Sequence, residues 1–294
     1  AHPVTAALGG LPTLHPGLLL LGFFSFLLPA AAHAGRSAVV YRAAAPVPFS
    51  AVALTTVAGN AVSYFMPWAV GDLGQPLVLK RLADLDIGAG FRALTLRLVH
   101  SLTALFFVGA LAMAYAHHTG MLALGDAIPF DEVPGTAAWI IGLLVCAGLA
   151  VVFVRMGFLP PAVRRPLARI WREIPRTVHL VRFPTHLVLT LWAGGELLLD
   201  CLPLWWIARG CGLEVPLHVL LTAQVVLAAL EYLPRAPGFL GFQEWTLSLA
   251  LGPVLAATPS AVTAFLVYRV LQGLWFGLSG LGAGWGILRI EGAR

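Results

Sequence analysis

The sequence predicts an all-α, polytopic membrane helix bundle, organised as a single transmembrane domain over residues 1–294. Only 11% of the residues are charged, 59% are hydrophobic, and the mean hydropathy is +0.88. A soluble domain carries roughly 25% charged residues, so this chain has too few to cover a water-facing surface. Several stretches approach the ~20 apolar residues that cross a ~30 Å hydrocarbon core. Helices are the expected elements because they satisfy their backbone hydrogen bonds internally within lipid.

Five full spans and two interrupted apolar regions are expected along the chain. The spans are residues 14–34, 91–117, 137–157, 184–207 and 260–288, and the interrupted regions are 48–82 and 216–256. Each interrupted region has an apolar run of nearly spanning length, then a Pro/Gly break, then a second apolar piece.

The loops predict the orientation. Residues 35–48 carry two arginines and no acid, and residues 155–182 carry seven arginines and one acid. The tail after Leu288 carries two arginines and one acid, whereas residues 117–136 carry three acids and no Lys or Arg. Lys and Arg concentrate in cytoplasmic loops, so the first three segments, with the C-terminus, are expected inside and residues 117–136 outside. These assignments agree only if both interrupted regions are re-entrant hairpins.

The basic loop at 155–182 allows two interpretations. Arg165, Arg169, Arg172 and Arg176 share one helical face, which fits a basic amphipathic helix lying on an anionic inner leaflet. A solvated positive-inside loop explains the same residues equally well.

The two interrupted regions also predict an internal repeat. They share the spacing P-x3-G-x2-G, formed by Pro67, Gly71 and Gly74 in one region and Pro234, Gly238 and Gly241 in the other. Repeat one then covers about 14–117 and repeat two about 184–288, joined by the linking span 137–157. An odd number of spans separates the copies, so the second is expected to be inverted. Such repeats place a transporter's site near the midplane, where the breaks meet; chance similarity between Leu/Ala/Val-rich segments is the alternative.

The breaks themselves predict a polar cavity. Pro234 and Pro237 remove backbone donors, while Gly238 and Gly241 supply the freedom to turn. Non-helical backbone at membrane depth is tolerated only where protein buries it or water reaches it.

Charged residues inside the expected spans are the candidate site, because such charges are costly and usually functional. Glu196 lies mid-span with Asp200 one turn on, and Arg269 of the last span is expected to face both acids. Arg269, assisted by Arg235, would bind a phosphate through its planar fork, and the acids would gate or position it. Alternatively, the three charges form a network that only fixes helix packing.

Five further charged residues are weighted differently. Glu244 follows the second break, where capping of a half-helix is the alternative to a site role. Arg97, Asp72, Lys80 and Arg81 are expected nearer the cytoplasmic interface, where long side chains reach water, and of these four only Asp72 is kept as a candidate headgroup residue.

Enzyme chemistry is not expected. The sequence contains no HExxH, no GxSxG and no nucleotide-binding glycine loop. No metal site, no cofactor and no nucleic-acid partner are therefore predicted. Cys146, Cys201 and Cys211 are odd in number and form no CxxC pair, so free thiols are expected, with a Cys201–Cys211 bridge as the alternative.

Two stretches carry a resemblance to a known family. "NAVSYFMPWAVGDLGQPLVLKRL" at 60–82 and "LPRAPGFLGFQEW" at 233–245 resemble the two signatures of the flippase-like membrane region of lysylphosphatidylglycerol synthases, the multiple peptide resistance factors. The matching positions are Asn60, Pro67, Gly71 and Asp72, then Pro237, Gly238, Gly241 and Glu244. Family members usually have one more N-terminal span, so a preceding segment is expected. The synthases' aminoacyl-transferase domain is missing from these residues, so the resemblance implies translocation of a lipid without its synthesis.

The resulting expectation is flipping of a phosphate-bearing lipid across the cytoplasmic membrane through a cavity between the two hairpins. The lipid would be an anionic phospholipid or a polyprenyl-phosphate-linked lipid. The alternative is an accessory subunit that scaffolds a membrane enzyme of lipid or envelope-glycan synthesis, and a lipid-modifying enzyme is the third interpretation. The oligomeric state stays open.

Overall fold

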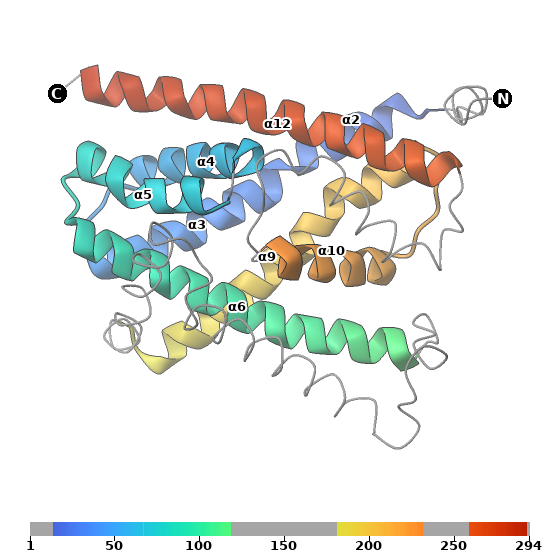
Figure 1. Cartoon of the computed structure of the whole chain (residues 1–294), viewed down its shortest axis with the longest axis horizontal. Coiled ribbons are helices and arrows are strands. Elements are labelled where there is room, and N and C mark those ends of the chain that lie inside the picture. The colour runs from blue at the N-terminus through green and yellow to red at the C-terminus, as the bar shows by residue number, and fades with distance from the viewer. Residues whose placement is uncertain (1–13, 67, 119–180, 232–258, 293–294) are drawn as a thin grey trace, which may run out of the picture.

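The computed structural model describes residues 14–66, 68–118, 181–231 and 259–292, and every regular element in these segments is an α-helix (Figure 1). The helices are α2 (Pro16–Ser25), α3 (Leu27–Ala44), α4 (Phe49–Phe65), α5 (Trp68–Ala83), α6 (Ile87–His118), α9 (Phe183–Gly210), α10 (Leu217–Glu231) and α12 (Pro259–Gly292).

Four of the described segments are long and apolar enough to cross a membrane: Pro16–Ala44, Ile87–Ala112, Phe183–Gly210 and Thr263–Gly292. The prediction of an all-α, multi-pass membrane protein is therefore confirmed. The linking span 137–157, residues 155–180 of the basic loop and the second break lie outside the described residues.

The first span is longer than the sequence predicted. The prediction ended it at residue 34, but α3 follows α2 after Phe26 and continues to Ala44. Arg36, which was assigned to a cytoplasmic loop, lies inside this helix and is 1% exposed. The helix continues past Arg36 because the guanidinium is neutralised inside the protein and a further apolar run follows it.

The pair α2–α3 runs antiparallel to α9. The backbone N–H of His15, just before α2, donates to the carbonyl of Gly210 at the end of α9, at 2.8 Å. Gly22 lies against Ile207, and Gly35 lies against the ring of Trp192. The glycines let these helices approach closely, so residue pairs along the whole length of the two spans are held opposite one another.

Helices α4 and α5 form a hairpin around Met66, whose backbone is extended (Figure 1). Met66 precedes a proline in the sequence, and such a position disfavours helix. Gly71 and Gly74, predicted as part of the break, instead lie inside α5, and that prediction is wrong. A Cβ on Gly71 would overlap the carbonyl oxygen of Gly59 in α4, so this glycine permits close packing. The placement of the hairpin as re-entrant in a membrane stays a prediction.

Asp86 caps the N-terminus of α6. Its carboxylate accepts a hydrogen bond from the backbone N–H of Ala89 at 2.8 Å, after a turn in which Asp84 has a φ of 52°. This tight turn directs α6 back beside α5.

Two apolar cores lie towards opposite ends of the molecule. One gathers residues from α3, α4, α5, α6 and the start of α9, and the other gathers residues from α2, the end of α9, α10 and α12. On α9, Leu189 belongs to the first core and Leu204 to the second. Glu196 lies between them, so the middle of this span is the place where a polar site interrupts the apolar packing.

Candidate functional site

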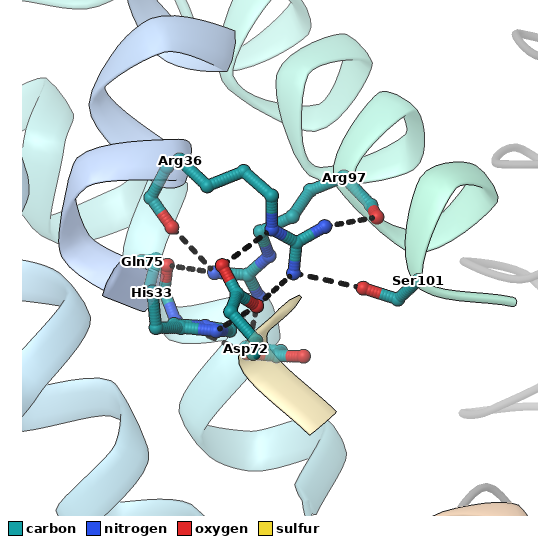
Figure 2. Close-up of polar contacts among 8 residues, drawn as sticks. His33, Arg36, Asp72, Gln75, Arg97 and Ser101 are labelled. Carbon is teal, nitrogen blue, oxygen red and sulfur yellow. Dashed lines mark hydrogen bonds and ion pairs between the residues drawn. The ribbon is translucent and has the colours of Figure 1, made fainter. Parts of the chain in front are cut away.

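Four charged side chains from four helices meet in the middle of the molecule (Figure 2). The first pair joins Arg36 of α3 to Glu196 of α9. Arg36 Nε donates to Glu196 Oε1, and Arg36 Nη2 donates to Glu196 Oε2, each at 2.8 Å. This bidentate contact is the strongest geometry that an arginine and a carboxylate can adopt.

The second pair joins Arg97 of α6 to Asp72 of α5. Arg97 Nη2 donates to Asp72 Oδ1, and Arg97 Nη1 donates to Gln75 Oε1 at 2.9 Å. Gln75 in turn donates to Asp72 at 3.1 Å, and Ser37 Oγ accepts a longer bond from Arg97. The hairpin α4–α5 thus supplies the carboxylate and the amide that hold this arginine.

The two pairs are connected. Arg36 Nη1 donates to the backbone carbonyl of Arg97 at 3.3 Å, and Arg36 Nη2 donates to Ser101 Oγ at 2.9 Å. Arg97 is 2% exposed and Glu196 is 7% exposed. The eight residues of this network, called the charged cluster below, are His33, Arg36, Ser37, Asp72, Gln75, Arg97, Ser101 and Glu196. The charges of its two arginines and two acids cancel in pairs.

Histidines lie on and beside the charged cluster. His33 Nδ1 is 3.2 Å from Glu196 Oε2, and 25% of the His33 side chain is exposed. His100 of α6 lies beside His186 of α9, with 2.9 Å between Nε2 and Nδ1. Imidazole groups from α3, α6 and α9 therefore lie beside the buried ion pairs.

Two buried polar atoms next to the cluster are unsatisfied within the described part of the chain. They are the Tyr41 hydroxyl oxygen and His100 Nδ1. Most buried polar atoms in proteins have a hydrogen-bond partner, so this neighbourhood has the capacity to bind a further polar group.

The predicted pairing of Arg269 with Glu196 is wrong. Arg269 of α12 donates to Gln272 at 2.9 Å, and its guanidinium lies 5.3 Å from the centre of the Tyr64 ring. The Tyr64 hydroxyl donates to the Arg269 carbonyl at 3.3 Å. Arg36 takes the place beside Glu196 because α2–α3 runs antiparallel to α9, which brings the middles of the two spans together.

The remaining predicted site residues fall into two groups. Asp200 lies one turn beyond Glu196 on α9, and Asn60 is half-buried on α4, outside the network of the charged cluster. Outside the described residues are Arg235, Glu244, Pro67, Pro234, Pro237, Gly238 and Gly241.

Sequence reasoning missed His33, Arg36, Gln75 and Ser101, and it placed Arg97 at the membrane interface. A signal for Arg36 was present, because the run Ala38–Val39–Val40–Tyr41 after it is apolar. His33 and Arg36 are also three residues apart, which puts them on one face of a helix. No comparable signal pointed to Gln75 or Ser101.

Other chemistry is limited among the described residues. They contain no group of three His, Cys, Asp or Glu placed to hold a metal ion. Cys201 and Cys211 are free and buried, so the alternative of a bridge between them is excluded. Burial raises the pKa of the Cys211 thiol, because it disfavours the thiolate.

Together, the four apolar spans and the charges buried between them define a multi-pass membrane protein with a polar site at its centre. The family model described as lysylphosphatidylglycerol synthase TM region matches residues 4–280. The chain therefore belongs to this family, as the two signature stretches indicated. Comparisons with curated proteins and with solved structures gave no match.

Proposed function

We propose that the protein flips a phosphate-bearing lipid across the cytoplasmic membrane, with the headgroup passing the charged cluster while the acyl tails stay in the bilayer. The observation that carries the proposal is the burial of Arg36 and Arg97 between two apolar cores. Ionisable groups are rare within membrane spans and generally mark the pathway of a substrate.

The chemistry of the cluster suits a phosphate. A guanidinium donates two parallel hydrogen bonds to a phosphate as readily as to a carboxylate. Glu196 and Asp72 occupy those donors in the structure. A lipid phosphate that replaces Glu196 on Arg36 would therefore exchange one pair of charge-assisted hydrogen bonds for another, which keeps the exchange reversible.

Arg269 would form a second binding site for the lipid headgroup along the path. Its guanidinium lies over Tyr64, near the tip of the hairpin α4–α5. Arg235, Glu244 and the second break would complete the path from the other repeat, as the inverted-repeat pattern predicts. The lipid would be an anionic phospholipid or a polyprenyl-phosphate-linked lipid.

The protein acts in this proposal as a transporter and not as an enzyme. The family assignment supports a role with membrane lipids, and the charged cluster offers binding groups for a headgroup. The C-terminus lies in the cytoplasm under this proposal, as the basic loops predict.

The test is translocation of fluorescent phosphatidylglycerol by the purified chain in liposomes. Arg36→Gln with Glu196→Gln removes one buried pair while keeping the site neutral, and Arg42→Gln is the control, since Arg42 lies exposed on the same helix. We expect the double variant to reduce protein-dependent flux at least tenfold and the control to keep it.

Two outcomes would contradict the proposal. Equal flux in the folded double variant would remove the charged cluster from the path. If the wild-type protein gave no flux above protein-free liposomes for any phosphate-bearing lipid, the accessory-subunit alternative would be favoured. Co-purification of a membrane enzyme in fixed stoichiometry would then be the result that supports it.

A further inference from the structure

The charge balance of the cluster limits what it can bind. Arg36 is neutralised by Glu196, and Arg97 is neutralised by Asp72. A lipid phosphodiester brings one additional negative charge. An uncompensated charge in a low-dielectric interior is costly, so the cluster has to gain a positive charge when an anionic headgroup enters it.

His33 is placed to supply that charge. It lies one helical turn before Arg36 on α3, and its Nδ1 is 3.2 Å from the Glu196 oxygen that also accepts from Arg36 Nη2. Its side chain is 25% exposed, whereas those of Arg36 and Glu196 are 2% and 9% exposed. Within the hydrogen-bonded triad, His33 is therefore the member least enclosed by the protein.

The helices packed against α3 set the electrostatic surroundings of His33. The charged and titratable groups near it are Glu196, Asp200 and His186 on α9, Arg97 and His100 on α6, and Arg36 and Tyr41 on α3 itself. Helix α2 carries no ionisable residue, and α4 carries only Tyr64. The charged group in direct contact with the His33 ring is the Glu196 carboxylate.

We propose that His33 takes up one proton each time an anionic headgroup enters the charged cluster, so that the movement of anionic lipid is coupled to a proton. This inference rests on the proposed function. The proton joins Nε2, because Nδ1 faces Glu196. The imidazolium then balances Glu196, and the Arg36 guanidinium is released to the phosphate. When the headgroup leaves, the proton returns to water and Arg36 binds Glu196 again.

The same charge balance predicts selectivity in the coupling. A net-neutral headgroup such as phosphatidylethanolamine carries its own positive charge and needs no proton from His33. Proton uptake therefore accompanies phosphatidylglycerol and not phosphatidylethanolamine, although both present the same phosphodiester to Arg36.

The first experiment measures flux of the two fluorescent lipids in liposomes at equal internal and external pH, from pH 5.5 to 8.5. His33→Asn keeps an N–H donor near the Nδ1 position and removes the titration. His218→Asn is the matched control, since His218 lies on α10 with its ring against Tyr115. We expect wild-type phosphatidylglycerol flux to fall by up to about tenfold per pH unit above the histidine range. His33→Asn should make that flux low and independent of pH, and phosphatidylethanolamine flux should stay flat in all three proteins.

The second experiment measures proton uptake on binding. Short-chain phosphatidylglycerol is added to the detergent-purified protein in weakly buffered solution with a pH indicator. We expect about one proton per bound lipid for the wild type and for His218→Asn, and none for His33→Asn. Inorganic phosphate, added alone, should give no uptake if the site requires a lipid, and uptake with phosphate would overturn the assignment to a lipid headgroup.

The failures of the two proposals can be told apart. If phosphatidylglycerol flux has the same pH profile in His33→Asn as in the wild type, the inference fails and the flippase proposal stands. If the profile flattens only in His100→Asn, the proton belongs to the pair His100–His186 and the assignment to His33 is overturned. If the wild type moves neither lipid, the proposed function fails, and the inference fails with it.

Discussion

The two buried arginines are stable in the protein interior because each has a carboxylate in direct contact. Arg36 satisfies Nε, Nη1 and Nη2 with Glu196, the Arg97 carbonyl and Ser101. Arg97 uses Asp72 and Gln75 in the same way. Burying a charge pair contributes little net stability. Removing one partner leaves the other charge buried without compensation, which lowers the stability of the fold by about 3–5 kcal/mol. The stability of the protein is therefore sensitive to substitution of one member of a buried pair. It is less sensitive to a double substitution that replaces both members with neutral residues.

Arg36→Met alone and Glu196→Leu alone are each expected to lower the free energy of unfolding by about 3–5 kcal/mol. The double variant is expected to lose less than either single variant, since it leaves no buried charge without a partner. Thermal unfolding in detergent, with Arg42→Met as the exposed control, measures the coupling. Additive losses in the double variant would mean that the two side chains do not compensate one another.

At the scale of elements, the hairpin α4–α5 supplies both side-chain partners that hold the buried Arg97. Arg97 of α6 finds Asp72 and Gln75 on α5, which lies beside it. By the shared P-x3-G-x2-G spacing, the positions equivalent to these two residues in the second repeat are Phe239 and Phe242. Arg269, the equivalent of Arg97, donates to Gln272 on its own helix. The predicted repeat therefore shares the P-x3-G-x2-G spacing but not the acid and the amide at the positions of Asp72 and Gln75.

Two glycines of α5 provide a matched test of the hairpin packing. Gly71→Ala is expected to destabilise the protein, because the new Cβ would overlap the Gly59 carbonyl oxygen and Ser63 Oγ, so the two helices would have to separate. At Gly74 there is open space, and alanine in a helix is favoured over glycine by roughly 0.5–1 kcal/mol. Gly74→Ala should therefore leave the melting temperature unchanged or raise it. A fall of similar size in both variants would contradict the close approach of α4 and α5 at Gly71.

At the scale of the whole molecule, the helix ends divide into two sides. The ends of α3, α5 and α12 and the start of α6 pack in one apolar core, with Val181 just before α9 against it. The same arrangement is visible on the C-terminal side of the molecule in Figure 1. Basic residues gather near these ends, at Arg42, Lys80, Arg81, Arg182 and Arg289. The positive-inside rule predicts that this is the cytoplasmic side.

The C-terminus is accordingly expected in the cytoplasm, opposite the end of α6. A cysteine introduced at Arg294 should react with a membrane-impermeant maleimide only after the cells are opened. A cysteine at Thr119, directly after α6, should react in intact cells. Labelling of both sites from the same side would contradict the predicted orientation.

Much of the fold followed from the sequence because it depends on local hydropathy. Spans α6, α9 and α12 were predicted to within a few residues of their ends, since long apolar runs in a chain with few charges have few alternatives in a membrane. The break after Phe65 followed equally from the Met66–Pro67 sequence. The first span was predicted too short because Arg36 was taken to end it, and local hydropathy does not show that Glu196 neutralises this arginine.

The sequence by itself determined that the chain is a multi-pass helical membrane protein of this family, with Glu196 and Asp72 as polar positions inside it. Only the tertiary structure decided the partners of these acids. Glu196 and Arg36 are 160 residues apart in the chain, and Asp72 and Arg97 are 25 apart. They meet because α2–α3 lies antiparallel to α9 and because α5 turns back onto α6. Pairing across helices depends on which faces pack together, and that is a property of the assembled bundle.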